Sequence, residues 1–208
     1  MAQGPGVDVY ADVVCPFAHV SLHRLFDARR AAGAEAVAVR VHAWPLEIVN
    51  GVPLARDHVA AEIVDLRDQV AGDLFVGFDA DAFPDSSVAA LGLTLAAYDL
   101  GPAVGEAMTL AVRDALFEQG RPIGDPDVLA AVAADLDVTL PDEAEARARV
   151  EADLAAGRER GVVGSPHFFL GAEDWFCPGL QIERRGEHFR IDVDAARFEA
   201  FLAAAFGG

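Results

Sequence analysis

An alternating apolar run near the start of the chain passes directly into a helical pattern, and this junction constrains the fold more than any other feature. Residues 7–14 alternate and are rich in β-branched side chains, which predicts a buried strand. Pro16 suits the first turn of a helix, and the apolar spacing after it predicts a helix that stops at Gly33. Residues 36–43 alternate again. A β-α-β unit with parallel strands and a right-handed crossover is therefore expected, which is half of a small α/β sheet.

The middle of the chain has a different pattern. Amphipathic segments separated by Gly and Pro predict helices over 54–71, 86–100, 102–119, 126–136 and 142–160. Strand patterns return at 167–170, 175–177 and 189–191, before a last helix over 194–206. We therefore expect an α/β domain formed by residues 1–52 and 161–208, with an all-helical lobe inserted over 53–160.

Charge and composition narrow the range of partners. The chain has 16 basic and 34 acidic residues and a formal net charge of -18, which opposes binding to nucleic acid. Its apolar runs are interrupted well before the ~18 residues that a membrane span needs. The first residues have neither a basic segment nor an apolar segment of signal length, so we expect a cytoplasmic protein. Two cysteines in 208 residues do not make a disulfide scaffold.

Cys15 lies at the predicted strand-to-helix junction. Unpaired backbone N–H groups at the amino end of a helix stabilise a thiolate, the reactive form of cysteine. Cysteine is also a common small apolar core residue, so this position alone leaves both interpretations open. A second feature is the glycine-rich turn at 161–164, which enters a strand through Ser165 and Pro166. Together the two features favour thiol chemistry at Cys15.

Four stretches, in this order and spacing, carry a family resemblance: 12–18 (DVVCPFA), 41–47 (VHAWPLE), 120–129 (GRPIGDPDVL) and 161–170 (GVVGSPHFFL). The chain resembles the DsbA-like oxidoreductases of the thioredoxin fold. It looks closest to the branch that includes FrnE-type proteins, 2-hydroxychromene-2-carboxylate isomerases and kappa-class glutathione transferases. The resemblance covers nearly the whole chain. It implies a cis peptide between Ser165 and Pro166, with the Ser165 backbone beside the Cys15 thiol, and a homodimer.

One position departs from the redox members of this family. Their motif is Cys-Pro-aromatic-Cys, and the second cysteine is replaced here by Ala18. A mixed disulfide on Cys15 then has no resolving thiol within the motif. The other thiol, Cys177, is expected on the strand next to the third strand rather than beside the helix start, so we do not expect it to resolve Cys15. The isomerase and kappa-class branches have Ser in place of the first Cys and use its hydroxyl to hold a thiol cofactor.

The remaining candidates surround this motif. His19 could stabilise the Cys15 thiolate as an imidazolium, or be a solvated helix residue. His167 could point into the site or sit on one face of a buried strand. Phe17 and Trp44 could line an apolar cleft for a flat substrate, or pack in the core. No His, Cys or carboxylate spacing argues for a metal site.

These observations lead to one function and two alternatives. The first is a thiol-dependent oxidoreductase in which Cys15 is catalytic, with His19 assisting. Pro16, Phe17, Ala18, Trp44, Ser165, Pro166 and His167 would then form the binding site for thiol and substrate. No tightly bound cofactor is expected, but a low-molecular-weight thiol, glutathione or mycothiol, would be the co-substrate. The alternatives are a thiol-dependent isomerase or transferase of small aromatic electrophiles, and a redox-inactive binding module.

Overall fold

The computed structural model describes residues 6–186 and 188–207. The strands are β1 (Val7–Ala11), β2 (Val39–Ala43), β3 (His167–Leu170), β4 (Glu173–Phe176), β5 (Leu180–Arg185) and β6 (His188–Val193). The helices are α1 (Pro16–Ala31), α2 (Leu46–Asn50), α3 (Arg56–Gln69), α4 (Val88–Asp99), α5 (Pro102–Phe117), α6 (Pro126–Ala134), α7 (Glu143–Arg160) and α8 (Ala195–Phe206), with a 3-10 turn at Ala80–Ala82.

A four-stranded mixed sheet with the order β2-β1-β3-β4 forms the centre of the fold. Strands β1 and β2 are parallel neighbours connected by α1, which confirms the predicted β-α-β unit. Strand β3 joins the other edge of β1 antiparallel, and β4 follows antiparallel to β3. This is the thioredoxin-like α/β arrangement that the sequence predicts. Strand β1 lies between β2, from the start of the chain, and β3, from its last part.

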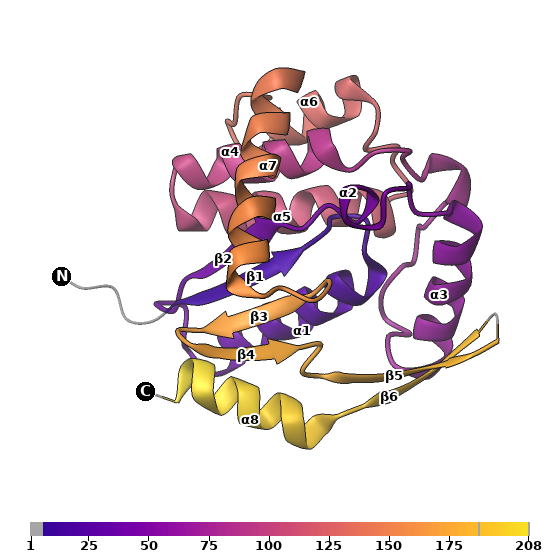
Figure 1. The fold of residues 1–208 in the computed structure, drawn as a ribbon, viewed down its shortest axis with the longest axis vertical. Helices are drawn as coiled ribbons and strands as arrows, with labels where there is room; N and C mark the ends of the chain where they lie inside the picture. The colour runs from indigo at the N-terminus through magenta and orange to yellow at the C-terminus, as the bar shows by residue number, and fades with distance from the viewer. Residues whose placement is uncertain (1–5, 187, 208) are drawn as a thin grey trace.

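The two faces of the sheet pack against different helices because side chains alternate along each strand. Val9, Val41 and Phe168 contribute to the main core, which also includes the buried face of α1. Phe168 also packs against Phe201 of α8, with ring centroids 5.1 Å apart. On the opposite face a smaller buried cluster joins the sheet to α7 and the segment after it: Tyr10, Trp44, Leu154, Val162 and Phe169. In Figure 1, α7 lies in front of the strands.

Five helices predicted between β2 and β3 are present, with ends that differ from the prediction by a few residues. The very apolar α4 is almost wholly buried, as its lack of a polar face predicts. Close approach between α4 and α7 occurs at Gly92, where an added Cβ would overlap Ala146. The short α2 and the 3-10 turn were not predicted, because one helical turn carries too little periodicity. The assignment of 53–160 as an inserted lobe stays a prediction.

The segment after β4 differs from the prediction. The sequence predicts one short strand at 189–191, whereas β5 and β6 form a two-stranded antiparallel hairpin apart from the main sheet. The hairpin lies beside α3 (Figure 1), where the Asp65 carboxylate accepts a hydrogen bond from the Phe189 N–H at 2.7 Å. Strand β5 was missed because most of its residues are exposed and several are charged. The hairpin also brings the Phe189 ring to 6.2 Å from that of Phe17 on α1.

Among the residues that the structure describes, none of the helices combines the length and the hydropathy needed to cross a membrane.

Candidate active site

Cys15 is the N-cap residue of α1 and Pro16 occupies the first position of that helix. Proline is well suited to this position because its fixed φ is helical and it has no N–H to leave unpaired. The Cys15 Sγ lies 3.3 Å from the carbonyl oxygen of Ser165, and the peptide bond between Ser165 and Pro166 is cis. The structure therefore brings together the cysteine and the Ser-Pro segment that the sequence singles out.

Hydrogen bonds of Asp12 hold the segment before Cys15 in place. The Asp12 N–H donates to the Ser165 hydroxyl oxygen at 3.0 Å. The Asp12 carboxylate accepts from the Leu46 N–H at 2.6 Å and the Val14 N–H at 3.2 Å. Full burial raises the pKa of this carboxyl to about 6, although these hydrogen bonds oppose the shift. The turn that presents Cys15 is thus held on both sides by buried polar contacts.

Arg113 on α5 is a positive charge that acts on Cys15. It is fully buried and its Nη1 donates to the backbone oxygen of Asp12 at 2.7 Å. Its Nε and Nη2 have no hydrogen-bond partner among the described residues. Burial lowers its pKa to about 10, while the charges of Cys15 and Asp12 act in the opposite direction. Arg113 can therefore stabilise an anion at the Cys15 sulfur.

Sequence reasoning missed Arg113, which lies about 100 residues from the motif. The available signal was a single arginine on an otherwise apolar helix face that includes Met108, Val112 and Leu116. A buried arginine needs a specific reason, since the desolvation of a charge is costly.

The protonation state of Cys15 differs from the expectation. Burial raises the pKa of the Cys15 thiol to about 11, because the side chain is only 4% exposed. Hydrogen bonding to Ser165, the Ala18 N–H and the Arg113 charge all act to lower this pKa, and the Glu62 charge acts to raise it. Desolvation raises the pKa of Cys15 by more than the N–H groups at the start of α1 lower it. Burial therefore favours the protonated thiol at neutral pH, which opposes the thiolate that the sequence predicts.

His19 does not contact Cys15 through its ring. The Nε2 of His19 lies 2.7 Å from the Oε1 of Glu118, and burial lowers the pKa of the imidazole. Glu118 also accepts hydrogen bonds from the N–H groups of Phe75 and Val76. The ring is packed among aromatic side chains, in a position that does not support an imidazolium beside the Cys15 sulfur or a solvated helix residue.

His167 and Trp44 lie in buried contacts on the α7 side of the sheet. The Nε2 of His167 is 3.1 Å from the Asp174 carboxylate, and the Val163 N–H donates to its Nδ1 at 3.3 Å. The indole of Trp44 packs edge-on against Tyr10. These contacts favour the strand-face and core-packing interpretations. Phe17, by contrast, follows Pro16 in the first turn of α1 and contacts Phe189 of the β5–β6 hairpin.

Cys177 lies closer to the site than the sequence predicts. It follows the last residue of β4, and its N–H donates to the Pro166 carbonyl oxygen at 3.3 Å. Both cysteines are free and buried. They contact the same dipeptide, Cys15 at Ser165 and Cys177 at Pro166. Burial strongly raises the pKa of the Cys177 thiol.

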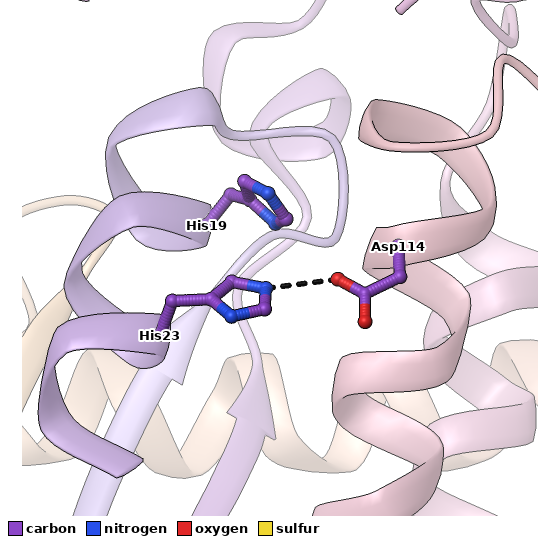
Figure 2. A group of neighbouring side chains, drawn as sticks. All are labelled: His19, His23 and Asp114. Carbon is purple, nitrogen blue, oxygen red and sulfur yellow. Dashed lines mark hydrogen bonds and ion pairs between the residues drawn. The ribbon is translucent and has the colours of Figure 1, made fainter. Parts of the chain in front are cut away.

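One cluster of potential metal ligands was not expected. His19 and His23 of α1 and Asp114 of α5 each offer one ligand atom, and these atoms lie within 4.8 Å of one another. Figure 2 shows the two imidazoles one turn apart along α1, packed edge to face, with His23 facing Asp114. The sequence signal was the i,i+4 spacing of the two histidines, but the third ligand is brought in only by tertiary packing.

A β-α-β unit whose first helix begins at a cysteine, with that cysteine against a Ser-Pro turn, defines a protein of the thioredoxin fold. The chain belongs to the DSBA-like thioredoxin domain family, whose model matches residues 6–183. No curated protein matches it in sequence.

Several solved structures share the fold. A 2-hydroxychromene-2-carboxylate isomerase is 24% identical, with 82% of this chain and 87% of that chain covered and a TM-score of 0.61. The cytosolic disulfide reductase DsbM from Pseudomonas aeruginosa is 19% identical, with 95% of each chain covered and a TM-score of 0.59, and it was also solved with GSH. A probable DsbA oxidoreductase from Streptomyces coelicolor is 18% identical, with 98% of this chain and 90% of that chain covered and a TM-score of 0.66.

Proposed function

We propose that this protein is a monothiol oxidoreductase in which Cys15 exchanges with a low-molecular-weight disulfide. The observation that carries the proposal is the position of the Cys15 sulfur at the amino end of α1, 3.3 Å from the Ser165 carbonyl oxygen, where the charge of the buried Arg113 also acts on it. A core cysteine that only fills space does not need a buried arginine whose Nε and Nη2 have no hydrogen-bond partner within the described part of the chain.

The reaction has two balanced steps. In the first, the Cys15 thiol loses its proton to solvent or to an incoming thiolate, and its sulfur attacks a disulfide R–S–S–R. A mixed disulfide forms on Cys15, and one RS⁻ leaves. In the second step the thiolate of a different thiol, R′–S⁻, attacks the R sulfur of the mixed disulfide, so that R–S–S–R′ is released and the Cys15 thiolate is restored. Arg113 and the Ala18 N–H stabilise Cys15 as an anion in both steps, and external thiol replaces the resolving cysteine that is absent at Ala18.

The co-substrate that we propose is glutathione or mycothiol, and the protein would act in the cytoplasm. The fold is shared with DsbM, which is described as cytosolic and was solved with GSH. Glutathione and mycothiol react through the same thiol chemistry but differ in the groups attached to the sulfur. Comparing adduct formation with their two disulfides therefore identifies the thiol that the protein uses. A small electrophile would be the second substrate, and a homodimer remains an expectation from the resemblance.

Intact-mass analysis tests this proposal. The protein is incubated with oxidised glutathione or oxidised mycothiol over a pH series, beside Cys15→Ala and a matched control, Cys177→Ala. We expect one adduct, absent in Cys15→Ala and retained in Cys177→Ala, whose rate saturates with disulfide concentration because the disulfide first binds. A rate that is linear in disulfide concentration and equal at both cysteines would contradict the proposal.

A second function is favoured by the protonated state of the thiol. A Cys15 thiol with a pKa raised to about 11 can donate a hydrogen bond to the thiolate of a bound cofactor without bonding to it covalently. The chain would then be a thiol-dependent isomerase or transferase of small aromatic electrophiles, and its fold is shared with an isomerase of this kind.

Cys15→Ser separates the two functions. A serine hydroxyl donates the same hydrogen bond but cannot form a disulfide. If the variant retains thiol-dependent isomerisation of an aromatic substrate, the second function is correct. If it loses all thiol-dependent turnover, the monothiol mechanism is correct. A protein that forms no adduct and has no turnover with either thiol would be the redox-inactive binding module.

A further inference from the structure

A cluster of metal-ligand side chains lies one helical turn below the candidate active site, between α1 and α5. His19 and His23 are four residues apart and so share one face of α1. Asp114 of α5 faces them, and its Oδ1 lies 2.8 Å from the Nε2 of His23. Figure 2 shows the three side chains converging from the two helices. This cluster has no role in the thiol chemistry proposed above.

His19 is arranged as a metal ligand would be. Glu118 accepts hydrogen bonds from two backbone N–H groups, those of Phe75 and Val76, and lies 2.7 Å from the Nε2 of His19. A carboxylate in this position requires the proton of a neutral His19 to be on Nε2, which leaves Nδ1 as an acceptor. That Nδ1 is buried and has no hydrogen-bond partner within the described residues.

Metal-binding histidines commonly donate their other ring N–H to a carboxylate, which fixes the tautomer and orients the ring. The pair formed by His19 and Glu118 has this arrangement. The His19 side chain is fully buried, whereas those of His23 and Asp114 are 21% and 32% exposed. The cluster thus has one rigid ligand and two that can adjust their rotamers from the solvent side.

We propose that His19, His23 and Asp114 bind one divalent transition-metal ion of the kind that prefers imidazole and carboxylate ligands, with Zn²⁺ as the reference ion. Two imidazoles favour Zn²⁺, Co²⁺ or Ni²⁺ over Mg²⁺ and Ca²⁺, which prefer oxygen ligands. Zn–N bonds of 2.0–2.1 Å place tetrahedral ligand atoms roughly 3.4 Å apart. The three ligand atoms, now within 4.8 Å of one another, need only small side-chain rotations to reach this geometry.

The position of the site indicates what a bound ion does. Cys15 begins α1 one turn before His19, and Arg113 immediately precedes Asp114 on α5. An ion held by these residues cross-links the helix that carries the candidate nucleophile to the helix that carries its neighbouring positive charge. Three protein ligands also leave at least one coordination position for water or another ligand.

Metal titration of tag-free protein tests this inference, with Zn²⁺ followed by calorimetry and Co²⁺ by its visible absorption spectrum. We expect one ion per chain. His23→Gln and Asp114→Asn each remove a partly exposed ligand and should weaken binding at least about tenfold, because the loss of even a hydrogen-bond partner of a ligand costs about that much in metal affinity. The matched control is His58→Gln on α3, which removes a partly exposed histidine paired with Glu62 and should leave the affinity unchanged.

The two thiols are the other groups that could take up a soft metal ion, so Cys15→Ala and Cys177→Ala are titrated as well. Binding that persists in both, with Co²⁺ absorption typical of nitrogen and oxygen ligands, supports the site. The inference is overturned if the wild-type chain binds neither Zn²⁺ nor Co²⁺, if His23→Gln and Asp114→Asn bind as the wild type does, or if a cysteine variant abolishes binding. Circular dichroism verifies that each variant is folded.

Discussion

The Sγ atom of Cys15 lies 3.3 Å from the carbonyl oxygen of Ser165, a residue 150 positions further along the chain. The same serine accepts a hydrogen bond through its hydroxyl oxygen from the Asp12 N–H. The start of α1 and the turn before β3 are therefore held together at the sulfur. This contact buries the thiol, and burial determines how it reacts.

The first prediction concerns pH. Since burial raises the pKa of Cys15 to about 11, its thiolate is scarce at neutral pH. As the pH is raised toward that value, the thiolate fraction increases about tenfold per pH unit. Iodoacetamide labelling of folded Cys177→Ala should therefore rise steadily through the alkaline range without levelling off near ~8.5, the pKa of an ordinary thiol. The labelling rate is measured by intact mass. A plateau at neutral pH would show a resident thiolate and contradict the burial argument.

Arg113→Met tests the electrostatic effect on the sulfur. Methionine keeps much of the apolar volume but removes the positive charge that lowers the pKa of Cys15. We expect the pKa to rise further, and a rise of half a unit corresponds to about threefold slower alkylation at a fixed pH. The comparison is the labelling rate beside wild type. The control is Arg121→Met, a change on the loop after α5, which should label at the wild-type rate. Faster labelling of Arg113→Met than of wild type would show that Arg113 does not stabilise the Cys15 thiolate.

Ala18→Cys should create a dithiol site. Positions 15 and 18 are three apart at the start of a helix, a spacing that brings Cβ atoms within about 5–6 Å. Cysteine adds only a sulfur at a buried position. We expect oxidation to form a disulfide between the two positions, seen as the loss of two hydrogens, and reduction of insulin disulfides to appear. Ala18→Ser is the control of similar size. If Ala18→Cys forms the disulfide but stays inactive, the site lacks more than the resolving thiol.

The contact between α4 and α7 gives a prediction about stability. A methyl group at Gly92 would overlap Ala146, so Gly92→Ala should lower the free energy of unfolding by about 1–3 kcal/mol, despite the better helix propensity of alanine. Ala146→Gly in the same chain removes the overlapping methyl and should restore part of this loss. Denaturant unfolding of the two single variants and the double variant measures the coupling. Additive losses would show that the helices do not meet at these residues.

Much of the architecture follows from local patterns. The β-α-β unit, the five long helices before β3 and the last helix all have periodicities that extend over several turns or a full strand. The β5–β6 hairpin does not, because most β5 side chains are exposed and the hairpin is stabilised by contacts with α3, such as that between Asp65 and Phe189. The alternation at Phe189 and Ile191 predicts one strand, but the exposed side chains of β5 do not indicate the strand that pairs with it.

The sequence by itself determined where the candidate cysteine, Cys15, lies: at the end of an alternating strand, before a helix-starting proline, and with Ala18 in place of a second cysteine. Those features depend on neighbouring residues, which is why local periodicity and motif spacing predict them. Only the tertiary structure decided the chemistry around it. Burial, which sets the Cys15 pKa, and the approach of Arg113 and Asp114 arise when α5 packs against α1. Desolvation and charge act through space, so they appear only once segments about 100 residues apart are in contact.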